Sequence, residues 1–158
     1  MNGLKIYEVN PRYVKYLSGF QDHIFISDGS KANRKYVGII LEIDGFKYFV
    51  PLSSFKQKHE KMGERVDFIK IKDYAVININ NMIPVPDSEF SLVDINRIAD
   101  QHYRFLLQAE SREINRQRNR IMKNADIVYK HKLRNGDNSP LAKRTNDFMI
   151  LEKACKDY

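Results

Sequence analysis

The chain has 158 residues, 42% of them hydrophobic, which is enough for one core, and we expect a single domain over residues 1–158. Its 27 lysines and arginines exceed its 20 aspartates and glutamates by seven, which favours an anionic partner such as nucleic acid. The single cysteine excludes an intrachain disulfide and a multi-cysteine zinc site, and no apolar run is long enough for a membrane helix, so we expect a cytoplasmic protein with no membrane partner. The apolar pattern is strand-like over residues 1–87 and helical over 88–158, which predicts an α+β fold built on an antiparallel sheet.

A β-hairpin is predicted in the middle of the strand-rich part. Residues 36–43 and 46–52 are rich in β-branched and aromatic side chains, and they flank Asp44-Gly45. This dipeptide is typical of a type I′ turn, because both central residues of that turn need a positive φ. The polar residues 18–35 are predicted to form a long loop, a position where binding residues often lie. The remaining strand-like segments are residues 4–9, 66–71, 75–79 and 82–86. The prolines of residues 82–86 predict that this segment is an edge strand.

Helices are predicted after residue 87. Residues 91–94, Ser-Leu-Val-Asp, have the hydroxyl and acid spacing of a helix start. One long helix is predicted over residues 99–133, because an apolar stripe repeats there every seven residues. Ser139-Pro140 is predicted to cap a further helix that continues through Glu152. The members of the stripe are Leu107, Ile114, Ile121 and Val128.

A dense set of polar side chains follows the second hairpin strand. Within residues 51–59, Pro-Leu-Ser-Ser-Phe-Lys-Gln-Lys-His, two hydroxyls, two ammonium groups and one imidazole occupy seven positions. RNA cleavage by the neighbouring 2′-hydroxyl requires proton transfer at two oxygens and stabilisation of a negatively charged phosphorane. These residue types can supply those functions, although the same segment is also typical of a solvated strand-to-loop exit. The candidates are Ser53, Ser54, Lys56, Lys58 and His59.

Other enzyme chemistries find no support in the sequence. It holds neither a P-loop nor a G-x-G-x-x-G phosphate-binding motif, and it lacks the H-E-x-x-H zinc motif. Its aspartates are scattered among a loop, a turn and strand ends, so they do not predict the carboxylate cluster of a two-metal nuclease. We therefore expect chemistry that uses no metal and no other cofactor.

The predicted long helix carries a second basic feature. Several of its cations share one face at spacings of three and four residues, which is the geometry of a ridge that can track an RNA backbone. The same spacing is also found on ordinary solvated helix faces. The cations are Arg112, Arg116, Arg118, Arg120 and Lys123.

Three stretches of the chain resemble the ToxN/AbiQ/CptN family, the endoribonuclease toxins of type III toxin–antitoxin systems. They are residues 12–17 (Arg-Tyr-Val-Lys-Tyr-Leu), residues 34–48 around the hairpin, and residues 51–59. Residues 81–85 are a weaker match. The resemblance covers roughly residues 4–95, and the part with residues 51–59 joined to the hairpin is the most specific.

The resemblance implies a fold, an activity and a partner. The fold is a strongly twisted antiparallel sheet flanked by helices, similar to the Kid/MazF toxins. The activity is metal-independent cleavage of cellular or phage RNA, leaving a 2′,3′-cyclic phosphate and a 5′-hydroxyl, in defence against phage by abortive infection. The partner is a tandem-repeat RNA antitoxin, which the toxin cuts into pseudoknot units and then holds in a closed protein–RNA assembly.

The resemblance also assigns catalytic residues. Ser53 and Ser54 match the adjacent hydroxyl pair of the family and Lys56 matches its lysine, so the serines are expected to hydrogen-bond the scissile phosphate while Lys56 stabilises the phosphorane. Tyr13 matches the tyrosine of the N-terminal stretch, and Arg34 stands where relatives carry a lysine. Both are expected to orient the phosphate or the adjacent base.

Further cations close to these positions are predicted to bind RNA. His59 is also an alternative general acid, because the usual pKa of a histidine lies near ~6.5. Two other interpretations stay open from the sequence: a non-catalytic RNA-binding module with the same basic surface, and a toxin neutralised by a protein antitoxin. The predicted RNA-binding cations beside the candidate site are Lys31, Lys35, Lys58 and His59.

Overall fold

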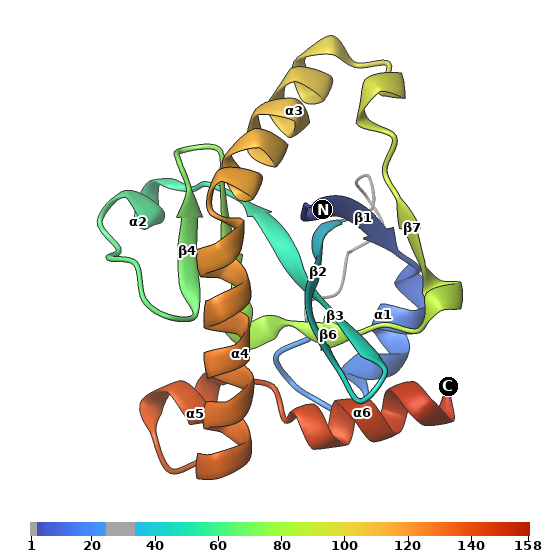
Figure 1. Ribbon diagram of the computed structural model, residues 1–158, viewed down its shortest axis with the longest axis vertical. Helices are drawn as coiled ribbons and strands as arrows, with labels where there is room; N and C mark the ends of the chain where they lie inside the picture. Colours follow the sequence, from blue (N-terminus) through green and yellow to red (C-terminus); the bar gives the residue numbers. More distant parts are fainter. Residues whose placement is uncertain (1–2, 25–33) are drawn as a thin grey trace.

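The computed structural model describes residues 3–24 and 34–158, and within them the strands form one seven-stranded antiparallel sheet (Figure 1). The strand order is β4-β5-β3-β2-β1-β7, and β6 pairs separately with β3. The strands are β1 (Lys5–Val9), β2 (Lys35–Ile43), β3 (Phe46–Ser54), β4 (Phe68–Ile71), β5 (Ala75–Asn78), β6 (Ile83–Pro84) and β7 (Phe90–Leu92). The helices are α1 (Pro11–Ser18), α2 (Gln57–Glu60), α3 (Gln101–Arg116), α4 (Arg118–Asn135), α5 (Pro140–Arg144) and α6 (Phe148–Asp157).

The predicted hairpin is confirmed as β2 and β3, the two longest strands. Asp44 and Gly45 have φ values of 52° and 84°, the positive values that a type I′ turn requires. Near the turn β2 and β3 pair with each other, and toward its end β3 continues with β5 as a second partner. The last two residues of β3, Ser53 and Ser54, therefore pair with Val76 and Ala75 of β5.

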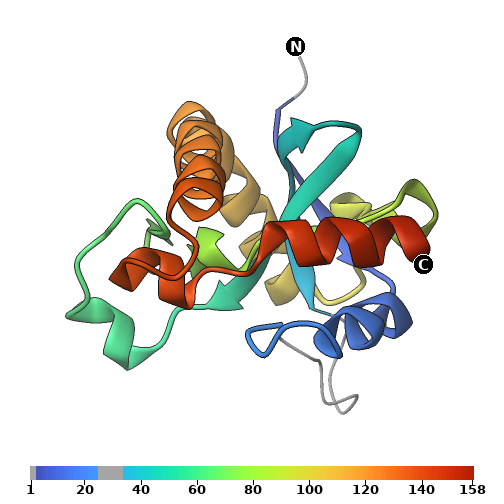
Figure 2. The same cartoon turned by 90° about the horizontal axis from the view of Figure 1, so that it is seen from below.

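Helices cover both faces of the sheet. On one face, α3 and α4 contribute the predicted stripe of Leu107, Ile114, Ile121 and Val128, whose members are each at most 1% exposed. On the other face, α1 and α6 pack in a second cluster of buried residues. Figure 2 shows α1 and α4 on opposite sides of the hairpin. Burial of this apolar surface on both faces is the main force that stabilises the fold.

The prediction of one long helix over residues 99–133 is wrong, because the helix is interrupted at Gln117. This residue has φ −100° and ψ 9°, so α3 ends at Arg116 and α4 begins at Arg118. The Gln117 side chain instead donates a hydrogen bond to the backbone carbonyl of Lys70 in β4, at 3.2 Å. Figure 1 shows α3 and α4 meeting at an angle beside β4. Attachment to the sheet thus coincides with the break in the helix.

Residues 91–94 are also not a helix start. Phe90–Leu92 form the edge strand β7, which pairs with β1 through Val9–Phe90 and Tyr7–Leu92. Pairing with β1 therefore overrides the local capping pattern, which is a weaker determinant than a sheet ladder.

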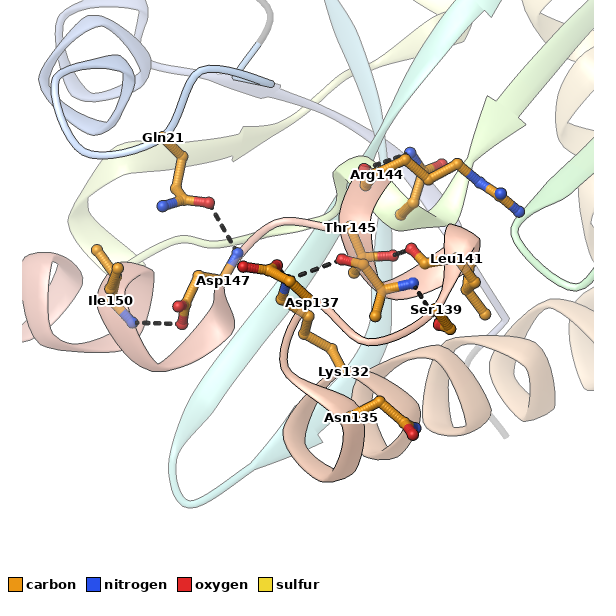
Figure 3. Close-up of polar contacts among 12 residues, drawn as sticks. Gln21, Lys132, Asn135, Asp137, Ser139, Leu141, Arg144, Thr145, Asp147 and Ile150 are labelled. Carbon is orange, nitrogen blue, oxygen red and sulfur yellow. Dashed lines mark hydrogen bonds and ion pairs between the residues drawn. The ribbon is translucent and has the colours of Figure 1, made fainter.

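The predicted helix after Ser139 is two helices, as the close-up in Figure 3 shows. Ser139 caps α5 as predicted, since its hydroxyl accepts a hydrogen bond from the Ala142 N–H at 2.9 Å. The chain then leaves the helix: the Asn146 N–H donates to the carbonyl of Asn80, and the Asp147 N–H donates to Gln21 Oε1. Asp147 begins α6 by accepting from the Ile150 N–H. Within the described residues, none of the helices has the length and hydropathy needed to span a bilayer.

Candidate active site and nucleic-acid interface

Four of the predicted residues lie together where β3 leaves the sheet. Ser53 and Ser54 are its last two residues, and Lys56 immediately precedes α2, which holds Lys58. The side chains of Ser54, Lys56 and Lys58 are exposed, and Ser53 is half-buried. Arg34 lies beside them, just before β2. We call the set of Arg34, Ser53, Ser54, Lys56 and Lys58 the strand-exit site.

Arg34 and Ser53 are in direct contact. The register of the hairpin pairs Tyr36 with Pro51, so the residues two positions further out, Arg34 and Ser53, face each other. Arg34 Nη1 donates a hydrogen bond to Ser53 Oγ at 3.0 Å. Burial lowers the pKa of the Arg34 guanidinium from its usual value, but a guanidinium stays charged at neutral pH. A fixed positive charge therefore lies beside a hydroxyl at this end of the sheet.

The two serines do not form one adjacent pair of hydroxyls on the same side. Successive side chains of a strand point to opposite faces, so Ser53 lies on the side of Arg34 and Ser54 is directed to the other side. Both residues lie at the open end of β3, and Ser54 is exposed. An RNA chain that crosses this strand end can contact both, whereas a phosphate lodged beside Arg34 lies on the side of Ser53.

His59 is placed differently from the sequence-based expectation of an exposed RNA-binding cation. It is only 6% exposed and packs between the rings of Phe55 and Phe68, at centroid distances of 5.6 and 5.8 Å. Its Nδ1 accepts a hydrogen bond from the backbone N–H of Lys56 at 2.8 Å. Burial, together with the charges of Lys58, Lys56 and Lys70, lowers the pKa of His59. The imidazole is therefore neutral at pH 7 and is part of the frame of α2.

Tyr13 lies away from the strand-exit site. It is fully buried in α1, and its hydroxyl donates to the backbone carbonyl of Pro84 at 2.6 Å. Burial raises the pKa of this phenol. Its ring meets Tyr158 at 4.9 Å between centroids. In this conformation, Tyr13 has no exposed surface for a phosphate or a base, and it holds α1 against β6 in place of the predicted orienting role.

Of the two other cations predicted beside the site, Lys35 is buried and Lys31 lies outside the described residues. Lys35 is buried, with its ammonium 2.8 Å from Glu8 Oε2 and 5.7 Å from the ring centroid of Tyr103. That charge is thus largely compensated within the sheet.

Two of the five cations of the predicted ridge are bound to glutamates, and the other three have no carboxylate partner among the described residues. Arg116 makes two hydrogen bonds to Glu113, at 2.9 and 2.6 Å, and these bonds are the main reason why the pKa of Glu113 is lowered to about 2. Arg120 lies 3.1 Å from Glu64 and donates a hydrogen bond to Gln117. Of the other three, Arg112 and Lys123 are exposed and Arg118 is half-buried.

The helix break opens a polar hollow that the sequence did not indicate. Two lysines of the β4–β5 hairpin, Lys70 and Lys72, face the residues on either side of the break. The hollow has a volume of about 600 Å³. Local sequence carries no signal for this meeting, because the lysines and the arginines are more than 40 residues apart. We call it the helix-junction hollow; it is lined by Glu64, Lys70, Lys72, Glu113, Arg116, Gln117, Asn119 and Arg120.

The hollow and the strand-exit site are joined by the β4–β5 hairpin. The N–H of Phe55, between Ser54 and Lys56, donates to the carbonyl of Tyr74 at 3.4 Å. Lys70 Nζ lies 3.5 Å from the carbonyl of Glu60 in α2 and faces the hollow as well. Cationic side chains thus continue from the site to the helix junction, which is the electrostatic pattern of a surface that follows a polyanion.

The described residues contain no group of three or more histidine, cysteine or acidic side chains arranged to hold a metal ion. The charged groups at the strand exit are cations, which suit a phosphate and repel a metal ion. The functional groups that the described residues present at the strand exit are those of lysine, arginine and serine.

Comparisons with known proteins agree with this geometry. The family model described as toxin ToxN of type III toxin–antitoxin systems matches residues 5–156. Endoribonuclease ToxN of Pectobacterium atrosepticum is 30% identical over 165 residues, covering 98% of this chain and 94% of that relative. Endoribonuclease AbiQ of Lactococcus lactis subsp. lactis is 28% identical over 167 residues, covering 98% of this chain and 89% of that relative.

A solved structure described as a type III toxin selectively inhibited by a non-coding RNA pseudoknot superposes with a TM-score of 0.87 at 27% identity, covering 99% of this chain and 98% of that chain. Another, in which a processed non-coding RNA regulates a bacterial antiviral system, has a TM-score of 0.86 at 26% identity, with 98% of both chains covered. The fold, the strand exit and the match along nearly the whole chain lead to one conclusion: this protein belongs to the ToxN family of toxins from type III toxin–antitoxin systems.

Proposed function

We propose that this protein is an endoribonuclease toxin that cleaves RNA without a metal ion and is inhibited by a repetitive RNA antitoxin. The observation that carries the proposal is the strand-exit site, where Lys56 is exposed next to the Arg34–Ser53 contact in a member of the ToxN family. The endoribonuclease names of the relatives support the activity.

The proposed reaction uses the 2′-hydroxyl of the substrate as the nucleophile. The 2′-oxygen forms a bond to phosphorus and loses its proton to water, while the bond from phosphorus to the 5′-oxygen breaks. Lys56 donates a proton to the departing 5′-oxygen, and Arg34 and Ser53 hydrogen-bond the phosphorane oxygens. Ser54 contacts the RNA on the other side of the strand end. The products are a 2′,3′-cyclic phosphate and a 5′-hydroxyl.

The proposed partner is an RNA with tandem pseudoknot repeats, which the toxin processes and then retains in a closed protein–RNA assembly. The RNA pseudoknot described for one neighbouring structure supports this partner, and the antiviral role described for another supports a function in phage defence. We assign the helix-junction hollow, the exposed Arg112 and Lys123 and the half-buried Arg118 to holding this RNA. The substrates are cellular or phage transcripts.

The test is cleavage of a labelled single-stranded transcript by purified protein in EDTA, with chemical mapping of the new ends. We expect cyclic phosphate and 5′-hydroxyl ends from the wild type, and a loss of rate of at least about 100-fold in Lys56→Ala. Lys61→Ala, an exposed lysine beyond α2, is the matched control and keeps its rate.

Each outcome of this test has a definite meaning. Cleavage that EDTA abolishes would exclude the metal-independent reaction. Binding of the transcript without any cleavage would support a non-catalytic RNA-binding module instead. Near-normal cleavage by Lys56→Ala would remove Lys56 from the mechanism while leaving the nuclease activity standing.

A further inference from the structure

A buried histidine fixes the backbone of the proposed catalytic lysine. The N–H of Lys56 donates to His59 Nδ1 at 2.8 Å, and the N–H of His59 donates to the carbonyl of Lys56 at 2.8 Å. Within residues 3–24 and 34–158, these two bonds are the hydrogen bonds made by the Lys56 backbone. The side chain of Lys56 is exposed, so its position depends on how its backbone is held.

The hydrogen bond determines the protonation state of the imidazole. Nδ1 accepts, so it carries no proton, and the single ring proton is on Nε2. A protonated imidazole has a hydrogen on both nitrogens, so its Nδ1–H would face the Lys56 N–H, donor against donor. The bond therefore exists only with the neutral ring.

The surroundings of His59 favour the neutral form. The residue is only 6% exposed, and its ring packs against Phe55 and Phe68. Three cations, Lys56 and Lys58 from its own turn and Lys70 from β4, act with burial to lower its pKa, and the neighbouring Glu60 of α2 is exposed. At neutral pH the ring is thus held as an acceptor, and acidification releases it.

We propose that His59 is a positioning residue for the cleavage reaction, which holds the ammonium of Lys56 at the scissile phosphate through its Nδ1 acceptor and releases it on protonation. The proposal rests on the proposed function, in which Lys56 acts on the phosphate. It replaces the alternative in which His59 is a general acid, because a buried ring whose Nδ1 is occupied by a backbone N–H does not present a proton to the RNA.

The two roles predict opposite pH dependence. A general acid must be protonated, so its activity rises as the pH falls toward the histidine pKa. A positioning acceptor must be neutral, so the cleavage rate falls as the pH decreases below the usual histidine value of about 6.5. This fall in rate at low pH is expected mainly in kcat, because Lys56 acts on the departing 5′-oxygen as the bond breaks.

Three variants separate these possibilities. His59→Leu keeps an apolar side chain between Phe55 and Phe68 but removes the acceptor, and we expect kcat to fall by about 10- to 100-fold with little change in KM. His59→Asn places an amide oxygen at the position of Nδ1, and this oxygen accepts a hydrogen bond at every pH. We therefore expect the variant to restore most of the lost rate and to remove the fall in kcat at low pH, which we call the acid limb. His102→Asn, at an exposed histidine of α3, is the matched control and keeps the wild-type profile.

The measurement is kcat and KM for cleavage of the same transcript in EDTA between pH 5 and 8. A wild-type rate in His59→Leu, or an acid limb that persists in His59→Asn, would overturn the positioning role. Equal inactivity of His59→Asn and His59→Leu would instead support the general acid. If the wild type itself cleaves no RNA, the proposed function fails, and that outcome is distinct from a failure of His59 to position Lys56.

A second readout needs no variant and no substrate. Nitrogen-15 spectra of the wild-type protein are expected to show His59 Nδ1 as the unprotonated ring nitrogen at pH 7. The Lys56 amide is expected to lose protection from hydrogen exchange as His59 titrates. A protonated Nδ1 at pH 7, or a Lys56 amide whose protection ignores the titration, would contradict the proposal even if a variant failed to fold.

Discussion

The strand-exit site and the helix-junction hollow are both basic, yet their cations are held in different ways. At the strand exit, Lys56 and Lys58 have no carboxylate partner within the described part of the chain, and Arg34 donates a hydrogen bond to the hydroxyl of Ser53. At the helix junction, Arg116 is bound to Glu113 and Arg120 to Glu64. The two lysines of the first region therefore offer uncompensated charge, and the second region offers charge held in place by acids.

This difference separates chemistry from retention. A phosphorane gains most from cations that are not neutralised by a neighbouring carboxylate, because the full field acts on the developing charge. The exposed Arg120–Glu64 ion pair contributes little to stability, so an RNA phosphate can share or replace that carboxylate at small cost. We therefore expect variants of the first region to change the rate, and variants of the second to change the affinity.

The same substitution in both regions tests this comparison with the largest expected effect. Arg34→Gln removes the guanidinium next to Ser53, and we expect kcat to fall by about 100-fold, because one charged donor to the phosphorane is lost. Arg120→Gln is expected to leave kcat within about twofold and to weaken RNA binding. Single-turnover kinetics at saturating protein measure the first, and equilibrium binding measures the second. Equal losses of kcat in the two variants would show that the two regions do not differ in their roles in catalysis and RNA binding.

The helix junction is expected to control the salt dependence of RNA binding. Each cation that contacts an RNA phosphate adds about 0.7 to 0.9 to the slope of log affinity against log salt, so Lys70→Gln combined with Lys72→Gln should lower the slope by about 1.4 to 1.8. The matched control is the pair Lys130→Gln and Lys153→Gln, exposed lysines that lie outside the hollow. Binding titrations at several salt concentrations supply the slopes. An unchanged slope in the hollow variant would exclude this surface as a contact for RNA.

The parts of the fold that the sequence predicted correctly depend on local patterns. Asp44-Gly45 determines the hairpin turn, whereas the pairing of Arg34 with Ser53 also depends on a register shift between Val37 and Leu41 that the turn does not predict. The stripe from Leu107 to Val128 survives the helix break, because both helices keep their apolar side toward the same core. Local turn chemistry and periodicity were sufficient for the turn and the stripe.

The features that the sequence missed depend on contacts between distant segments. Gln117 interrupts the helix where its side chain donates a hydrogen bond to the carbonyl of Lys70, 47 residues earlier. Tyr13 is buried against β6, where its hydroxyl donates a hydrogen bond to the carbonyl of Pro84, 71 residues later. A tyrosine in a family motif gives no local sign of whether it faces RNA or the core. His59 is similar, because its burial by Phe68 comes from the approach of β4.

The smallest expected effect concerns two buried glutamates of α3, one with a cationic partner and one without. Glu113 is bound by Arg116, whereas no side chain within residues 3–24 and 34–158 hydrogen-bonds to Glu110. Burial raises the pKa of Glu110 from 4.5 to about 7, while the bonds from Arg116 lower that of Glu113 to about 2. The same helix thus contains a compensated and an uncompensated acid.

The two shifts have opposite consequences for stability. Between pH 4.5 and about 7 the folded protein binds more protons at Glu110 than the unfolded chain does, so the contribution of Glu110 to stability falls as the pH rises through this window. Glu110→Gln removes that penalty and should stabilise the protein by about 1–2 kcal/mol at pH 8, with little effect at pH 4.5. Glu113→Gln should instead destabilise it at pH 8, because Arg116 loses its partner. Urea denaturation of both variants at the two pH values measures the sign, and destabilisation by Glu110→Gln at pH 8 would mean that its carboxylate is compensated after all.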